Sequence, residues 1–137
     1  MNGFEKLSES QVVTHSYHLT ELVYQGFLHT FDDRNLLHID ENYAKSKGFK
    51  SKVMHGNILN GFLSHFIGMV FPGENVIIHS QSIDYKKPSF IGDQIEIQAT
   101  VDQLVSSVQT ALLKIRLQNK TQEYLCAKGK VQVGFLI

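Results

Sequence analysis

Between residues 94 and 133 the sequence alternates apolar and polar side chains, and a period of two is typical of β-strands. The alternation falls into three runs, at residues 95–101, 111–117 and 125–133. Turn residues lie before and between the runs: Gly92 and Asp93, Ser106 and Ser107, Asn119 and Lys120. Strands of this kind put their apolar residues on one face. The runs therefore predict an antiparallel sheet, joined by hairpins, with one face that another element must cover.

One helix ahead of these strands is suited to cover that face. Between residues 55 and 69, apolar side chains recur at three- and four-residue spacing, as in an α-helix with one buried side. They are Ile58, Leu59, Phe62, Leu63, Phe66 and Ile67. The remaining positions carry almost no charge, which predicts a helix that is buried on most sides.

The chain is therefore predicted to be α+β, with about five antiparallel strands wrapped around a central buried helix. Two more strands, at residues 14–19 and at residues 76–89 closed by Pro88, complete the five. The hot-dog fold has this arrangement. With 137 residues, 42% of them hydrophobic, and only two prolines, we expect an ordered single domain over residues 1–137.

Two shorter helices are predicted before the buried one. Thr20 is positioned to cap a helix that runs through about His29. The inward stripe of that helix is predicted to be Leu22, Val23, Gly26 and Phe27. Asp40 is the expected cap of a short helix over residues 41–47, ended by Gly48. The polar residues 32–38 between the two helices are predicted to form a loop.

Charge and targeting signals limit the partners of the chain. Thirteen basic and thirteen acidic residues cancel, so the chain lacks the broad positive field that nucleic-acid binding needs. A local basic site for a nucleotide-bearing cofactor is still compatible with this neutral balance. The single cysteine, Cys126, lies in a strand-like run and is interpreted as buried and structural. Residues 1–13 lack a secretory pattern, and no apolar run is long enough to span a bilayer. We therefore expect a cytoplasmic protein without nucleic-acid or membrane partners.

Neither a metal site nor a serine triad is expected. His15 and His18 are three residues apart in a predicted strand, so they would point to opposite faces. In His38-Ile39-Asp40, the aspartate is already explained as a helix cap. No serine occurs in a Gly-x-Ser-x-Gly turn.

A better candidate for chemistry is Asp33 with His38, followed later by His55 and Gly56. Hydration of an α,β-unsaturated thioester needs a water that is held and deprotonated over the β-carbon, and a donor to the enolate oxygen. A carboxylate and an imidazole on one loop suit the first task. A free amide at the start of a buried helix suits the second. On these residues alone, an ordinary solvated loop with His55 as a helix-start residue fits equally well.

The surrounding residues resemble the Asp-x-Asn-Pro-x-His-x-Asp signature of MaoC-like hydratases, the hydratase 2 group. The matching stretch is Asp33-Arg34-Asn35-Leu36-Leu37-His38-Ile39-Asp40. Further matches follow at the family's spacing: Ala44, Gly48-Phe49, Val53, His55-Gly56, Leu59, Ser64, Gly68, Pro72-Gly73, Tyr85-Lys86-Lys87-Pro88 and Gly92-Asp93. The resemblance runs from about Leu19 to Val101.

This resemblance implies a hot-dog enzyme that reversibly hydrates trans-2-enoyl thioesters to (R)-3-hydroxyacyl thioesters. Asp33 and His38 match the catalytic pair that positions and activates water, and the Gly56 backbone amide matches the group facing the thioester oxygen. Three residues are assigned to substrate binding: Asn35, which matches the asparagine shaping the loop, His55 and Ser64.

The resemblance also implies a homodimer. Coenzyme A or an acyl-carrier protein would belong to the substrate, with no separate cofactor. Lys86 and Lys87 are candidate phosphate partners, although a lysine pair at a strand end is commonly a solvated edge.

The chain departs from the family pattern at four positions. Phe31 and Asp32 replace a small residue and a glycine, Leu36 replaces a proline, and Asn57 replaces a methionine. None of these changes removes a catalytic group, so they put substrate choice in question more than the reaction.

Two other functions stay open on the sequence. A thioesterase would use a carboxylate and a helix-start amide to attack the thioester carbon itself, although such enzymes of this fold rarely carry the Asp33–His38 loop. A non-catalytic acyl-thioester-binding protein would bind ligand without turnover, since a fold does not fix a function.

Overall fold

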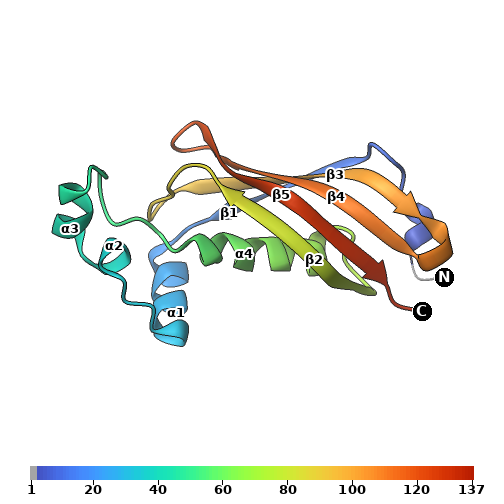
Figure 1. Cartoon of the computed structure of the whole chain (residues 1–137), viewed down its shortest axis with the longest axis horizontal. Helices are drawn as coiled ribbons and strands as arrows, with labels where there is room; N and C mark the ends of the chain where they lie inside the picture. Colours follow the sequence, from blue (N-terminus) through green and yellow to red (C-terminus); the bar gives the residue numbers. More distant parts are fainter. Residues whose placement is uncertain (1–2) are drawn as a thin grey trace.

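Five antiparallel strands form one sheet that curves over a helix in the computed structural model, which describes residues 3–137 (Figure 1). The strands are β1 (Val12–His18), β2 (Val76–Tyr85), β3 (Gln94–Val105), β4 (Thr110–Asn119) and β5 (Tyr124–Phe135). Their order across the sheet is β1-β3-β4-β5-β2, so β1 and β2 are the edges. The predicted α+β hot-dog arrangement of five strands around a helix is confirmed.

The helix predicted from the apolar period is α4 (Gly56–His65), which continues into a π-helical turn, η2 (Phe66–Val70). Three further helices lie together at the end of the sheet where α4 begins (Figure 1). They are α1 (Glu21–Phe31), α2 (Leu36–Ile39) and α3 (Glu41–Ser46). Two 3₁₀ turns, η1 (Phe4–Lys6) and η3 (Ser106–Val108), complete the described elements. Within residues 3–137, no helix has both the length and the apolar character needed to cross a membrane.

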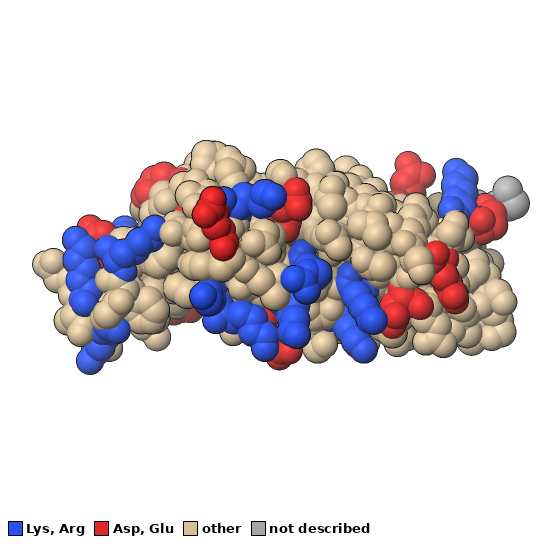
Figure 2. Space-filling view, turned by 90° about the horizontal axis from the view of Figure 1, so that it is seen from above, with Lys and Arg blue, Asp and Glu red and all other residues tan. Residues whose placement is uncertain are grey.

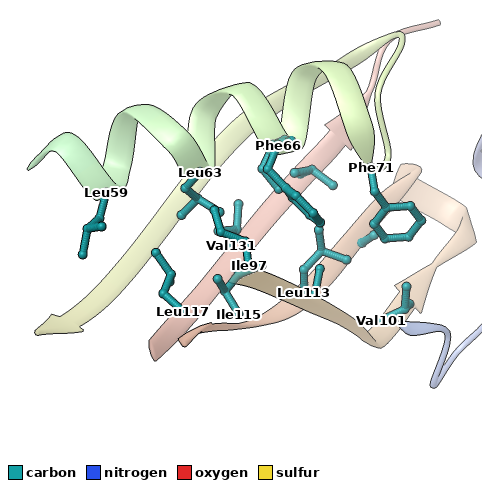
Figure 3. Packing of buried hydrophobic residues seen from close by; sticks show 14 of the residues in the cluster. Leu59, Leu63, Phe66, Phe71, Ile97, Val101, Leu113, Ile115, Leu117 and Val131 are labelled. Carbon is teal, nitrogen blue, oxygen red and sulfur yellow. The ribbon is translucent and has the colours of Figure 1, made fainter. Parts of the chain in front are cut away.

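The core lies between α4 and the inner face of the sheet (Figure 3). Leu63 and Phe66 extend from the helix side toward strand residues such as Leu113. All three are at most 1% exposed, and burying a side chain of this size contributes about 1.5–3 kcal/mol. The alternation in the sequence therefore identified the correct inward face of the central strands.

Both predicted helix caps are present. The Thr20 hydroxyl accepts a hydrogen bond from the Val23 amide at 3.1 Å, and the Asp40 carboxylate accepts one from the Tyr43 amide at 2.9 Å. These side chains satisfy first-turn amides that have no partner within the helix. Gly48 follows α3 with a φ of +91°, the left-handed conformation that glycine adopts without strain.

The predicted inward stripe of α1 is wrong at Leu22, which is 82% exposed, and at Gly26, which is also exposed. Tyr24 and Leu28 are the buried residues of this helix. The reason is tertiary: the Tyr24 hydroxyl donates to the His38 carbonyl oxygen at 2.6 Å and turns that face of α1 inward. Helical spacing alone did not identify this anchor.

Two further expectations need correction. Residues 36–39 form the short helix α2, because the Asn35 side chain caps it by accepting from the Leu37 amide at 3.0 Å, whereas a loop was predicted. The uncharged side of α4 is also open in the single chain, since Gly61, Ser64 and Gly68 are exposed. One sheet has only one inner face, and it covers only one side of the helix.

We predict that Gly129→Ala disrupts the pairing of β2 with β5. A Cβ at this position would lie 1.8 Å from the Ser82 carbonyl oxygen, so backbone would have to move. Overpacking of this kind is expected to cost about 1–3 kcal/mol, measured by urea unfolding. Gly61→Ala is the control: outside its chain neighbours and its own helix backbone, no heavy atom of the described chain lies within 4 Å of the added Cβ. Loss of a helical glycine should stabilise by about 0.5–1 kcal/mol. An unchanged unfolding midpoint for Gly129→Ala would contradict the close approach of the two strands.

Candidate active site

The loop between α1 and α2 is shaped by its own polar side chains. Asp32 ends α1 in the left-handed conformation, with a φ of 53°, which aspartate tolerates better than most residues. The next residue, Asp33, accepts a hydrogen bond from the Asn35 amide at 3.3 Å. Asn35 then caps α2, which carries His38. The two candidate catalytic residues are thus joined by one turn and one short helix.

His38 is oriented by backbone groups from another segment. Its Nδ1 lies 2.7 Å from the Val53 carbonyl oxygen, and because a carbonyl only accepts, Nδ1 must carry the proton. The Nε2 lone pair of the neutral ring is then free to accept a proton. The part-buried His38 ring is therefore held in the tautomer that a general base needs.

His55 is buried, at 3% exposure, and lies at the start of α4. Its Nε2 donates to the Asp33 carbonyl oxygen at 2.9 Å, and its ring centroid is 4.0 Å from that of His38. Burial lowers the pKa of His55 below its usual range, and the nearby His38 adds to the effect, although the hydrogen bond to Asp33 opposes it. At neutral pH His55 is therefore uncharged and fixes the backbone of Asp33.

The structure brings Asp33, His38 and His55 together. A carboxylate oxygen and one nitrogen from each imidazole lie within 4.8 Å of one another. Sequence reasoning paired Asp33 with His38 but did not find the triangle with His55, because the two histidines are 17 positions apart in the chain. Such a donor set has the composition of a metal site, so the expected absence of a metal stays a prediction.

Gly56 begins α4 and lies against an aromatic ring. A Cβ here would be 3.0 Å from Cε1 of Tyr85, at the end of β2, so any larger residue would crowd this ring. The atoms nearest to this added Cβ belong to Tyr85, which the sequence identified only as part of the Tyr85-Lys86-Lys87-Pro88 match. Within residues 3–137 no side chain caps α4, which leaves its positive N-terminal end uncapped beside the three converging residues.

Two cavities meet at this point. The first, of about 500 Å³, is lined by Asp33, His38, His55 and Gly56, with Lys86 and Lys87 among its other residues. The second, of about 770 Å³, runs between α1 and α4. Its lining is largely apolar: Val23, Gly26, Phe27, Thr30, Phe31, Asp33, Asn57, Ile58, Asn60, Gly61 and Phe62. Asp33 and Asn57 line both cavities. The Asp33 carboxylate therefore lies where the first cavity, with polar and apolar lining residues, joins the largely apolar second cavity.

Not every predicted site residue reaches this junction. Ser64 is exposed on α4 and lies outside the residues that line the two cavities of the described chain. Asn35 is exposed, caps α2 and is not among the residues that line the two cavities, so its assignment to substrate binding stays a prediction. Asn57 adds a polar group to both cavities, and its side-chain oxygen accepts from Asn60, which also donates to the Tyr85 hydroxyl.

Comparison with known proteins matches residues 5–123 to the model of the MaoC like domain. The chain belongs to the MaoC-like family. An (R)-specific enoyl-CoA hydratase from Rhodospirillum rubrum is 33% identical over 105 residues, which are 77% of this chain and 73% of that one. A mitochondrial 3-hydroxyacyl-[acyl-carrier-protein] dehydratase from Arabidopsis thaliana is 35% identical over 63 residues, 46% of this chain and 37% of that protein.

The solved (R)-hydratase from A. caviae, described as involved in PHA biosynthesis, superposes with a TM-score of 0.87 at 26% identity. The match covers 96% of this chain and 98% of that one, so the hot-dog fold of the MaoC-like family extends over nearly the whole chain.

The structure explains two departures from the MaoC-like pattern. The glycine position is left-handed, a conformation that Asp32 tolerates, and the exposed Asp32 carboxylate pairs with Arg34. Asp32 is not among the residues that line the two cavities. Leu36 occupies the proline position, which is the first residue of α2. Proline suits that position because it needs no amide partner there.

We predict that Leu36→Pro stabilises this MaoC-like chain. Asn35 already has a φ of −52° and a ψ of 130°, a conformation that a following proline favours, and Leu36 is half exposed. Restricting the unfolded chain should raise the free energy of unfolding by about 0.4–1 kcal/mol. Denaturant unfolding measures this, with Leu37→Pro as the matched control. Leu37 donates its amide to Asn35, so that variant should be destabilised. A destabilised Leu36→Pro protein would contradict the assignment of position 36 to the start of α2.

Proposed function

We propose that this chain is a hydro-lyase that reversibly hydrates trans-2-enoyl thioesters to (R)-3-hydroxyacyl thioesters. The observation that carries the proposal is the convergence of the Asp33 carboxylate and the His38 imidazole beside the uncapped start of α4. The similarity to the R. rubrum hydratase supports the same reaction.

The two side chains would hold one water between them. The His38 Nε2 lone pair and the Asp33 carboxylate both accept hydrogen bonds, so the water can donate one hydrogen bond to each of them. As one proton leaves, the water oxygen bonds to C3 of the enoyl group, and the double-bond electrons move to the thioester oxygen. The side chain that took the water proton then returns a proton to C2 while the enolate reforms the thioester carbonyl, which completes the hydroxyacyl product and restores the catalytic pair. His55 is assigned a positioning role, because it contacts the Asp33 backbone.

The Gly56 amide would stabilise the negative charge that develops on the thioester oxygen. It is the first amide of a ten-residue helix, where the helix dipole adds positive potential. The Tyr85 ring against Gly56 would hold this end of α4 in place.

The two cavities suggest how the substrate is seated. The acyl chain fits the apolar cavity between α1 and α4, and the thioester lies at the junction formed by Asp33 and Asn57. The carrier part of the bound substrate would extend out of the first cavity past Lys86 and Lys87, whose positive charges suit phosphate groups. Coenzyme A or an acyl-carrier protein is then part of the substrate, and the proposed reaction needs no other cofactor.

A homodimer is proposed on the surfaces that the single chain leaves open. The exposed side of α4 has no charged residue between Gly56 and Val70, and Met69 on it is 73% exposed. The edge strand β2 exposes Ile77 and has unpaired backbone groups along one side. A second copy would cover both features.

We predict that Asp33→Asn and His38→Gln each lower the hydration rate of crotonyl-CoA by about 10²–10⁴-fold, since each removes a group that handles the water proton. Loss of the enoyl absorbance measures the rate. Leu22→Gln, on the exposed face of α1, is the matched surface control and should keep wild-type activity.

Wild-type activity in both folded variants would refute the catalytic assignment. Release of free thiol from a saturated acyl-CoA would indicate a thioesterase instead. Binding of enoyl thioesters by wild type without turnover, on both coenzyme A and carrier protein, would indicate a non-catalytic binding protein.

We predict that Gly61→Leu shortens the acyl chain that the enzyme accepts. Gly61 lines the apolar cavity, and the space beside it is open within the described chain. A leucine there should lower kcat/KM for octenoyl-CoA by about tenfold or more relative to crotonyl-CoA, because each lost methylene contact has an effect of that order. Kinetics with a series of chain lengths, together with the oligomeric state of the variant, measure this. An unchanged chain-length profile would place the acyl chain elsewhere.

A further inference from the structure

Four cationic side chains form a block on the outer face of the sheet, the face turned away from α4. Lys114 and Arg116 lie on β4, and Lys128 and Lys130 lie on β5. The strand register places Lys114 directly opposite Lys130, and Arg116 directly opposite Lys128. Figure 2 looks onto this side of the molecule and shows Lys and Arg side chains gathered near its middle. These four residues are called the outer cationic block below.

This arrangement is unfavourable for the folded chain alone. Like charges directly opposite each other on neighbouring strands are destabilising. Lysines on edge strands prevent unwanted strand pairing, but β4 and β5 are interior strands, so that explanation does not apply. Two carboxylates flank the block: Asp102 lies 3.3 Å from the Lys114 Nζ, and Asp84 is opposite Lys128. Four cations against two anions leave the block positive.

The block also surrounds a hollow. A depression of about 390 Å³ is lined by all four cations together with Ser82, Asp84, Thr100, Ile115 and Gly129. Acidic side chains of a partner could enter it and pair with several cations at once. Arg116 offers a planar group suited to carboxylates.

Positive charge continues from the block to the mouth of the active-site cavity. The Lys86 amide donates to the carbonyl of Cys126, which is two residues before Lys128 on β5. Lys86 and Lys87 line the cavity that contains Asp33 and His38. At about 3.3 Å per strand residue, the basic surface extends roughly 13 Å along β5 between Cys126 and Lys130. A protein surface covers such a length more readily than the phosphates of one nucleotide.

We propose that the outer cationic block is the docking surface for an acidic carrier protein that delivers the acyl thioester. This inference rests on the proposed function and names the carrier: the acidic surface of the carrier binds the block, while its thioester arm passes Lys86 and Lys87 into the cavity. Complementary charge at such a surface mainly speeds association and selects the partner.

The test compares Arg116→Gln/Lys128→Gln with Lys6→Glu, which changes the net charge by the same amount at an exposed residue outside the block. Binding of fluorescently labelled bacterial holo-acyl-carrier protein is measured by anisotropy. Hydration of crotonyl-acyl-carrier protein and of crotonyl-CoA is measured in parallel. We expect the double variant to raise both the Kd for the carrier protein and the KM for crotonyl-acyl-carrier protein about tenfold at low salt. Lys6→Glu should match wild type.

Four results would overturn the docking surface: absence of carrier binding by wild type, equal binding by wild type and the double variant, an equal loss in Lys6→Glu, or a loss confined to crotonyl-CoA. The last result would assign the block to the phosphates of coenzyme A. Block-dependent carrier binding without hydration of either thioester would support the docking surface and refute the proposed hydro-lyase activity. Because the double variant removes a like-charge pair, its urea midpoint should not fall, which separates a binding defect from a folding defect.

Discussion

The packing of α4 into the inner face of the sheet is the contact on which the rest of the structure depends. Leu63 and Phe66 are buried against the central strands, and this fixes where α4 begins. The start of α4 then places His55 beside the 32–38 segment and Gly56 beside Tyr85 of β2. A helix shifted along the sheet would lose both contacts together, so the core and the candidate active site are set by the same packing.

Backbone carbonyls orient the histidines of the site. Val53 accepts from His38, and Asp33 accepts from His55, while Tyr24 holds the main chain at His38. Since a carbonyl can only accept, each imidazole has its proton on a known nitrogen. Burial lowers the pKa of His55, which favours its uncharged form. This arrangement separates a positioning histidine from the histidine proposed to act on water.

Net charge conceals how the charges are distributed. Thirteen cations and thirteen anions cancel over the chain, yet four cations lie together on two interior strands. The inner face of the same strands is apolar, because alternate residues point to opposite sides. One pair of strands therefore supplies the core with Leu113 and Val131 and supplies the outer surface with the cationic block. The proposed chemistry and the proposed docking surface share this framework.

The sequence by itself determined the fold class and the main elements, because period-two alternation, helical spacing and caps such as Thr20 and Asp40 are local properties. It also placed Asp33 and His38 on one short segment. Tertiary structure alone decided which face of α1 turns inward, since Tyr24 of α1 meets the His38 carbonyl of the next helix, α2. It alone brought His55 to Asp33, and Arg116 opposite Lys128. These contacts depend on the packing of α4 and the register of the strands, which join residues far apart in the chain and leave no local pattern in the sequence.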